Sequence, residues 1–470
     1  VDRMFWACSG TRSSILPAAK ICWTARQSST SFSLPRAADF GEHNGSMLNG
    51  ILSPARTAWE GLQERLFFLP PFPDELDSLA LFSMLLVVGL LVGEWLRAKL
   101  GWPKVIGYVL AGTLFGPSVL GWISIEALAQ IRPMADAALG LLTLEIGRRL
   151  DLRWLGENRD LLRATLGEIT LSFTAIFLFA WGFVGLMPAW AAAAAAVTMA
   201  SAPAVVLLTV EESNAQGQVT ERIILHTALS AAASFVVFAV VVGVVHAQYS
   251  DDWLNAAAHP LWVVVGSVMI AWLMALLARL VAALLPKRSL AQVFILVATA
   301  LFAVGTARML AVPVFLTLFL MGVILSFTDQ ERTLSYTNLP EGHWLLAIIL
   351  FVVVGASLPW QDFSWLIGLQ AIGLLIVRAV AKVTAVAWAG GGLGVARRVL
   401  VGIGIQPLSA TAVFMAYEIA GLYPEIGRSS LSLPLFAAAV MELAGPALCR
   451  FAVVRAGETM ATDNSKEGVA

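Results

Sequence analysis

The sequence predicts an all-α polytopic membrane protein, and three observations carry that prediction. Hydrophobic residues make up 59% of the 470 residues and charged residues only 13%, whereas a soluble domain is nearer half apolar and a quarter charged. The apolar residues gather in uncharged runs of about twenty, the length that crosses a bilayer as a helix. Lysine and arginine are concentrated in every second loop between these runs, as expected when alternate loops lie on the same side of a membrane. This composition excludes a soluble enzyme, a nucleic-acid binder and a disordered chain.

Thirteen apolar runs are separated by proline, glycine or charge. Backbone groups in lipid must be hydrogen-bonded within their own segment, so each run is expected to form a helix. The predicted spans are residues 78–98, 105–122, 133–148, 164–187, 189–210, 221–246, 261–284, 290–309, 312–328, 343–358, 364–388, 399–419 and 432–454.

The loops between the spans carry an asymmetric charge. If the first span enters from outside, the inner loops collect most of the basic residues, including 148–149 and 397–398, whereas the outer loops collect Arg132, Arg308 and Arg428. Positive residues favour the cytoplasmic side. The bias predicts a multi-pass protein of the cell (inner) membrane with its N-terminus outside and its C-terminus in the cytoplasm.

The chain is expected to have three parts. Residues 1–76 are predicted to be a largely disordered tail with a candidate interfacial helix at 51–68, residues 77–455 the transmembrane domain, and residues 456–470 a short cytoplasmic tail. Residues 1–46 are rich in arginine and serine, as transit peptides are, but lack an amphipathic period. We prefer an over-extended gene start or a disordered tail, with Met47 as a candidate first residue.

Two predicted spans, the fifth and the twelfth, carry a proline deep in their interior, Pro203 and Pro407. Proline removes an amide donor and clashes one turn back, so each helix should kink or unwind there. Backbone freed in this way must be covered by protein or face a water-filled cavity. A simple kink is the alternative to a broken helix.

The two prolines are seven spans apart, and a second pair of landmarks repeats that offset. The second and ninth spans each have a proline before the helix and a glycine nine residues later, Pro103 with Gly112 and Pro313 with Gly322. One span separates the two six-helix halves, so the second half enters with inverted topology. Paired broken helices in inverted repeats place a substrate site near the bilayer midplane.

Several strings in residues 78–454 carry a resemblance to a known family. They are Gly-Trp-Pro-Lys-Val-Ile-Gly-Tyr-Val-Leu-Ala-Gly at 101–112, Gly-Pro at 116–117, Leu-Asp-Leu at 150–152, Ser-Ala-Pro-Ala-Val-Val at 201–206, Phe-Val-Val-Val-Gly-Ala-Ser-Leu at 351–358, and Arg378 with Lys382. On these residues the chain resembles the monovalent cation:proton antiporters, a sodium/hydrogen exchanger-like group that includes potassium efflux systems.

The resemblance implies a secondary active transporter that exchanges Na⁺ or K⁺ for protons. It implies alternating access, with a six-helix core moving against a scaffold in the lipid bilayer, and a homodimer. No cofactor, resident metal or nucleic-acid partner is expected from the composition and the motifs. The ion pathway is expected around the broken helices, at Ser201, Pro203, Ser230, Ala231, Ala232, Arg378, Lys382, Gln406, Pro407, Ser409 and Glu442.

Both acidic residues that this family usually carries are missing. Relatives have an aspartate in the middle of the sixth span, where this chain has Ala231 and Ala232, and often Gly-Glu after the twelfth-span break, where this chain has Ser409 and Ala410. A dehydrated cation needs a formal negative charge or a dense set of oxygen dipoles. Either another carboxylate has taken over, or the coupling is lost.

The remaining intramembrane charges allow two interpretations. Arg378 and Lys382 are four residues apart and therefore share a helix face. They either pair with a cation-binding acid or brace the broken helices by bonding free carbonyls, and without the sixth-span acid we prefer bracing for both. Glu442 is the acid most exposed to desolvation and so the preferred functional candidate. Glu168, one turn into the fourth span, is interpreted as an inner-face charge.

Two further hypotheses remain open. A degenerate relative would carry a neutral or anionic solute, attracted by Arg378 and Lys382. A non-transporting membrane scaffold would keep the fold for partner binding. An enzyme is not supported, because the sequence contains neither a metal-ligand cluster nor a nucleophile–base constellation.

Overall fold

A computed structural model of the chain describes most of the predicted transmembrane domain. The residues described are 58, 78–150, 156, 158–249, 253–284, 290–328, 342–362, 364–408, 410–422 and 424–459. Apart from residue 58, the predicted tail 1–76 lies outside them, and so do residues 460–470. The division of the chain into three parts therefore stays a prediction.

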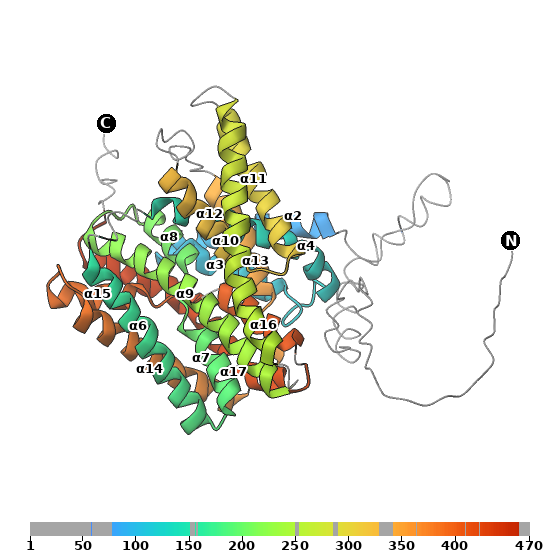
Figure 1. Cartoon of the computed structure of the whole chain (residues 1–470). Helices are drawn as coiled ribbons and strands as arrows, with labels where there is room; N and C mark the ends of the chain where they lie inside the picture. The colour runs from blue at the N-terminus through green and yellow to red at the C-terminus, as the bar shows by residue number, and fades with distance from the viewer. Residues whose placement is uncertain are drawn as a thin grey trace, which may run out of the picture. The chain divides into compact units, whose positions relative to one another are not determined.

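The described residues are almost entirely helical, and their extended structure is limited to an isolated bridge between Ala215 and Thr459 (Figure 1). The first half contains α2 (Ser78–Leu100), α3 (Lys104–Phe115), α4 (Ile125–Arg149), α6 (Arg159–Leu178) with the π-helix η1 (Phe179–Val184), α7 (Pro188–Met199), α8 (Pro203–Glu212) and α9 (Gln218–Tyr249). The rest contains α10 (Trp253–Ala283), α11 (Leu290–Met309), α12 (Val314–Thr328), α13 (Gly342–Ala356), the 3₁₀-helix η2 (Trp360–Asp362), α14 (Trp365–Ala389), α15 (Val395–Gly404), α16 (Ala410–Leu422) and α17 (Pro424–Arg455).

Each of the thirteen predicted spans coincides with one of these helices or with a pair of them. The fifth span is the pair α7–α8, and the twelfth is the pair α15–α16. Eight of the described helical segments are long and apolar enough to cross a membrane, and four shorter apolar helices accompany them. The prediction of an all-α polytopic membrane protein is confirmed.

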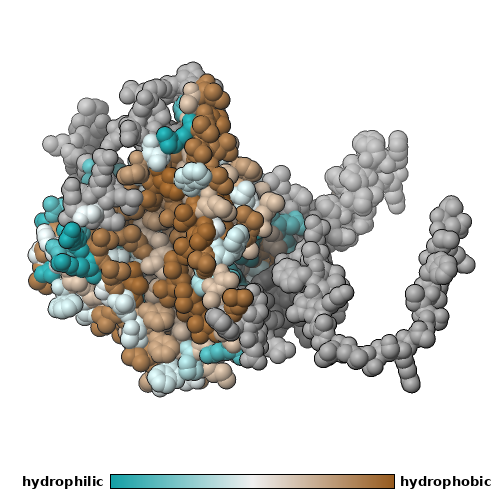
Figure 2. Space-filling view, in the orientation of Figure 1, coloured by the Kyte–Doolittle hydropathy of each residue, from teal (hydrophilic) through white to brown (hydrophobic). Residues whose placement is uncertain are grey.

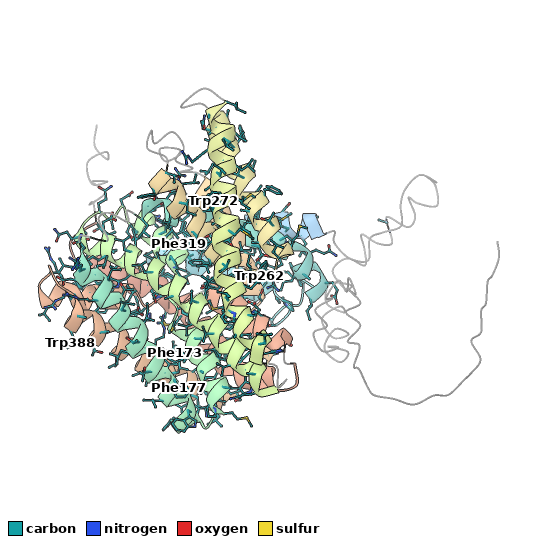
Figure 3. The ribbon with its side chains drawn as sticks, in the orientation of Figure 1. Phe173, Phe177, Trp262, Trp272, Phe319 and Trp388 are labelled. Atoms are coloured by element: carbon teal, nitrogen blue, oxygen red, sulfur yellow. The ribbon has the colours of Figure 1, made fainter. Side chains whose placement is uncertain are left out.

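Apolar side chains cover much of the outer surface, as expected for helices that face lipid. Hydrophobic residues dominate the face of α10 in Figure 2. Of the aromatic residues labelled in Figure 3, Trp272 on α10 is 55% exposed and Trp388 on α14 is 89% exposed, whereas Phe319 on α12 is 3% exposed. In water such exposure would be unfavourable, but lipid tails accept these side chains without that cost.

The two halves are built on the same helix contact. A Cβ atom added at Gly112 of α3 would lie 2.0 Å from the Val352 carbonyl oxygen of α13, and one added at Gly322 of α12 would lie 2.3 Å from the Leu144 carbonyl oxygen of α4. The second span (α3) thus packs on the tenth (α13), and the ninth span (α12) packs on the third (α4) in the same way. A repeat offset of seven spans predicts this, because it makes the second span equivalent to the ninth and the third equivalent to the tenth. Glycine is needed at both positions because the backbones touch.

The broken pair α7–α8 forms the centre of the bundle. Of the most apolar stretch in residues 188–212, 94% is buried. The alanine-rich α7 packs against α6, α9 and α17, and α8 packs against α9, α17 and α4. Small side chains let these neighbours approach closely, so side chains from several helices converge on the break between α7 and α8.

Candidate functional site

The two interrupted helices meet at their breaks. Helix α7 ends at Met199 and α8 begins at Pro203, while α15 ends at Gly404 and α16 begins at Ala410. The Ala202 amide donates to the Pro407 carbonyl oxygen (2.9 Å), and the Ser201 hydroxyl donates to the Ile405 carbonyl oxygen (2.9 Å). The breaks are therefore two unwound, mutually bonded segments rather than simple kinks.

Arg378 on α14 joins both breaks through their carbonyl groups. Its Nε donates to the Thr198 carbonyl oxygen and one terminal nitrogen to that of Ala200, each at 2.7 Å. The other terminal nitrogen donates to the Gln406 carbonyl oxygen (2.7 Å) and to Gln406 Oε1 (3.0 Å). The C-terminal ends of α7 and α15 carry partial negative charge and unsatisfied carbonyls. The bracing expected from the sequence is therefore found for Arg378.

Lys382, one turn further along α14, has a different environment. Its Nζ donates to Oε1 of Glu168 on α6 and to the hydroxyl of Ser201 (2.9 Å). Both charged side chains are fully buried. The bracing role expected for Lys382 was therefore wrong, because a carboxylate lies within its reach. Helices α6 and α14 run side by side (Figure 1), which brings the two residues together.

The carboxylate of Glu168 lies beside the position where the sequence lacks an acid. Its Oε1 accepts a bond from the Ser230 hydroxyl on α9 (3.4 Å), and its Oε2 has no hydrogen-bond partner. Ser230 directly precedes Ala231, which is fully buried, and Ala232, which is half-buried. A carboxylate from α6 thus reaches the neighbourhood of the two alanines of α9.

The interpretation of Glu168 as an inner-face charge was wrong. Helix α6 begins at Arg159 and not near residue 164, so Glu168 lies nine residues inside it. One sequence signal pointed inward: Thr165, Glu168 and Ser172 are spaced three and four apart and therefore share one helix face. All three are buried.

His226 on α9 is buried and is hydrogen-bonded to this polar stripe of α6. Its Nδ1 lies 2.8 Å from the Thr165 hydroxyl, which also donates to the Leu161 carbonyl oxygen (2.9 Å). Thr165 and His226 lie about one turn before Glu168 and Ser230. Polar contacts between α6 and α9 therefore extend about one turn from the buried ion pair toward the start of α6.

The other expected pathway residues are placed as follows. Pro203 is the first residue of α8 and Pro407 accepts a bond within the second break. Glu442 on α17 is fully buried, and neither of its oxygens has a hydrogen-bond partner. It is not part of the Glu168–Lys382 pair. Ser409 lies outside the described residues.

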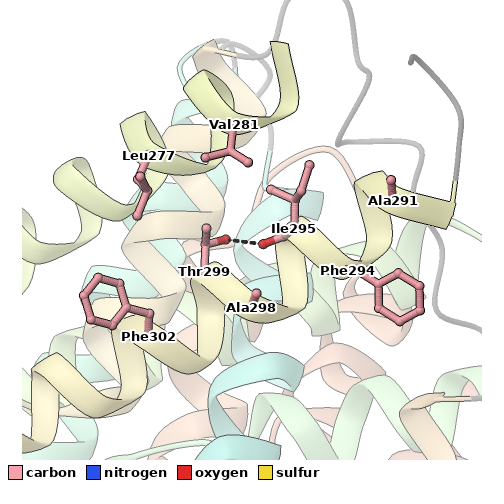
Figure 4. Close-up of a pocket in the computed structure, with 8 residues that line it drawn as sticks. All are labelled: Leu277, Val281, Ala291, Phe294, Ile295, Ala298, Thr299 and Phe302. Carbon is pink, nitrogen blue, oxygen red and sulfur yellow. Dashed lines mark hydrogen bonds between the residues drawn. The ribbon is translucent and has the colours of Figure 1, made fainter. Parts of the chain in front are cut away.

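The described side chains offer no group of three or more His, Cys, Asp or Glu residues that would hold a metal ion. A hollow of about 530 Å³ lies between α10 and α11, away from the ion pair (Figure 4). Its lining is apolar apart from the Thr299 hydroxyl, which donates to the Ile295 carbonyl oxygen (2.7 Å). Such a lining suits a lipid tail and not an ion.

Comparisons with known proteins give the family. A family model described as "Sodium/hydrogen exchanger, transmembrane" matches residues 83–444. A stretch of 93 residues is 37% identical to the Na(+)/H(+)-K(+) antiporter GerN of Bacillus cereus, and it covers 19% of this chain and 23% of that protein. The matched stretch thus spans about a quarter of the curated relative.

Solved structures share the fold. The sodium proton antiporter MjNhaP1 from Methanocaldococcus jannaschii at pH 8 aligns with a TM-score of 0.60 at 16% identity, covering 80% of this chain and 98% of that one. An electron-microscopy structure of MjNhaP1 gives a TM-score of 0.56 at 16% identity, covering 82% and 98%. Since the family model spans most of the chain, this multi-pass membrane protein belongs to the sodium/hydrogen exchanger family.

Proposed function

We propose that this protein exchanges Na⁺ or K⁺ for protons across the membrane, and that Glu168 and Lys382 form the exchange site. The observation that carries the proposal is a fully buried carboxylate–ammonium pair beside two broken helices, in a chain of the sodium/hydrogen exchanger family. Charges at this depth are costly and are retained chiefly for function.

The chemistry of the site gives the coupling. Glu168 supplies the formal negative charge that a dehydrated cation needs, and the hydroxyls of Ser201 and Ser230 supply neutral oxygens nearby. A cation that binds Glu168 displaces the ammonium of Lys382. An ammonium left without its partner in a dry interior costs several kcal/mol, so Lys382 releases a proton. Cation and proton then occupy the site in alternation, which is antiport.

The broken helices provide the movement in this proposal. Arg378 and the bonds between the two breaks hold the unwound segments together as one unit. A six-helix core that carries this unit moves against the scaffold and opens the ion pair to either side in turn. A cytoplasmic C-terminus, residence in the cell (inner) membrane and a homodimer belong to the same proposal.

Transport of an anionic solute receives less support from the contacts. Such a solute needs a cation that is available to bind it. All three guanidinium nitrogens of Arg378 donate to protein oxygens, and Lys382 is bonded to Glu168 and Ser201. A passive scaffold is disfavoured because a buried ion pair generally adds no stability over apolar packing.

Flux measurements test the proposal. Purified protein in vesicles should show pH-dependent Na⁺ or K⁺ flux, and Glu168→Gln should lower it at least tenfold because the variant removes the only proposed charged cation ligand. Glu126→Gln is the matched control, since this glutamate is exposed in the first turn of α4. Absence of Na⁺ and K⁺ flux at every pH, with the protein demonstrably folded, would reject the function.

A further inference from the structure

A second buried carboxyl group lies beside the other helix break. Glu442 on α17 is fully buried and both of its oxygens lack a hydrogen-bond partner. It faces the backbone amide of Ala410, the first residue of the 13-residue helix α16. Gly445, one turn along α17, packs directly on Pro407: a Cβ atom added there would lie 2.8 Å from the Pro407 Cα atom. Glu442 is therefore held at the break between α15 and α16.

A second polar group at the same helix start is also without a partner. Thr411, which follows Ala410, is 2% exposed, and its hydroxyl oxygen makes no hydrogen bond within the described structure. Buried polar atoms are nearly always paired, and exceptions often mark a functional role. Three unpartnered oxygen atoms from two elements thus gather at the start of α16.

Cations on the neighbouring helices are engaged elsewhere. Helix α17 packs against α3, α7, α8, α14, α15 and α16. On α14, Arg378 bonds carbonyl groups and Lys382 bonds Glu168. Lys104 at the start of α3 pairs with Glu94, and Arg397 and Arg398 are in the first turn of α15, at the far end from its break.

The remaining neighbours offer Glu442 no positive charge either. Helix α7 carries no charged residue, and α8 carries two glutamates at its last positions. Glu418 is two turns further along α16, and on α17 itself Arg450 is two turns beyond Glu442. Among the described side chains, therefore, no ion pair compensates the Glu442 carboxylate.

The protonation state follows from the balance of two effects. The N-terminal end of a helix stabilises a nearby carboxylate only modestly. Removing an unpaired carboxylate from water costs several kcal/mol even after the protein relaxes, so the desolvation cost is the larger. The neutral acid avoids this cost.

We propose that Glu442 is a second proton-binding site, protonated in the conformation seen here and independent of the Glu168–Lys382 pair. The two buried acids then differ in charge: Glu168 is the anionic partner of Lys382, and Glu442 is a neutral acid at the start of α16. This inference does not require the proposed cation exchange.

Infrared spectroscopy of the purified full-length protein tests the inference. Near neutral pH the wild type should show the C=O stretching band of a protonated carboxyl group in an apolar setting. The band should disappear in Glu442→Gln and persist in Glu168→Gln, and transfer to D₂O should shift it. A band that is unchanged in Glu442→Gln, lost only in Glu168→Gln, or unshifted in D₂O would overturn the inference.

Two further variants keep the test decisive if Glu442→Gln folds poorly. Glu442→Asp keeps a carboxyl group and should keep a protonated band with a shifted position, whereas Thr411→Val removes the neighbouring hydroxyl and should move the band without abolishing it. A band that neither substitution affects would belong to another residue. Wild-type protein that shows the Glu442 band but no cation flux would refute the proposed exchange and leave this site in place.

Discussion

The two halves of the molecule share a scaffold but differ in the polar groups placed at their breaks. Equivalent glycines, Gly112 and Gly322, bring equivalent helix pairs into backbone contact. At the first break Ser201 accepts a bond from a lysine that is paired with Glu168. At the second break Glu442 is buried without an ion pair among the described residues. The comparison shows that the glycines repeated in both halves determine how the helices pack, whereas residues that are not repeated determine the charge at each break.

Arg378 should show the largest effect, because it is the residue common to both breaks. Arg378→Met leaves three carbonyl oxygens and the Gln406 side-chain oxygen without their donor. Breaking a buried charged network of this kind costs about 3–5 kcal/mol, which thermal unfolding in detergent would register as a large loss of stability. The control is Arg455→Met, an exposed arginine in the last turn of α17. Equal stability of the two variants would refute the bracing role.

The ion pair at the first break should show the next largest effect, and a double-mutant cycle can isolate it. Lys382→Gln leaves the buried Glu168 carboxylate without its cation, and Glu168→Gln leaves the buried Lys382 ammonium without its anion. Each single variant should lose about 3 kcal/mol of stability. The double variant should lose less than the sum of the two, with a coupling of about 1–3 kcal/mol. Additive losses would mean that the two groups do not interact.

The matched glycines should show the smallest effect and test the symmetry directly. Gly112→Ala and Gly322→Ala each insert a methyl group against a carbonyl oxygen, at 2.0 Å and 2.3 Å in the present backbone. Overpacking of this kind costs about 1–3 kcal/mol, and the two variants should lose similar stability. Gly305→Ala is the control, because nothing lies within 4 Å of its added Cβ atom. A loss of stability in only one of the two glycine variants would contradict equivalent packing.

The sequence predicts the helices well because their signals are local. Length and hydropathy define all thirteen spans. Two prolines define both breaks, because the loss of an amide donor interrupts the proline's own helix regardless of which helices pack against it. The repeat is visible for the same reason: the positions of proline and glycine relative to each helix start are properties of short segments.

The pairing of Lys382 with Glu168 was not predictable in the same way. The two residues are 214 positions apart, and their contact depends on how α6 and α14 are rotated about their axes. The sequence favoured Glu442 as the replacement acid. The predicted start of the fourth span was five residues later than the start of α6, which placed Glu168 near the membrane surface. The spacing of Thr165, Glu168 and Ser172 was the one local signal of an inward-facing polar stripe.

The central claim is that Glu168 of α6 performs the role for which α9 has no acid. Proton release from purified protein in weakly buffered solution, on addition of Na⁺ or K⁺, tests it most directly. The account predicts release from the wild type, none from Glu168→Gln, and partial recovery in the exchanged double variant Glu168→Ser, Ser230→Asp, which moves the carboxylate to the α9 residue in contact with it. Release of equal size from Glu168→Gln and the wild type would contradict the account.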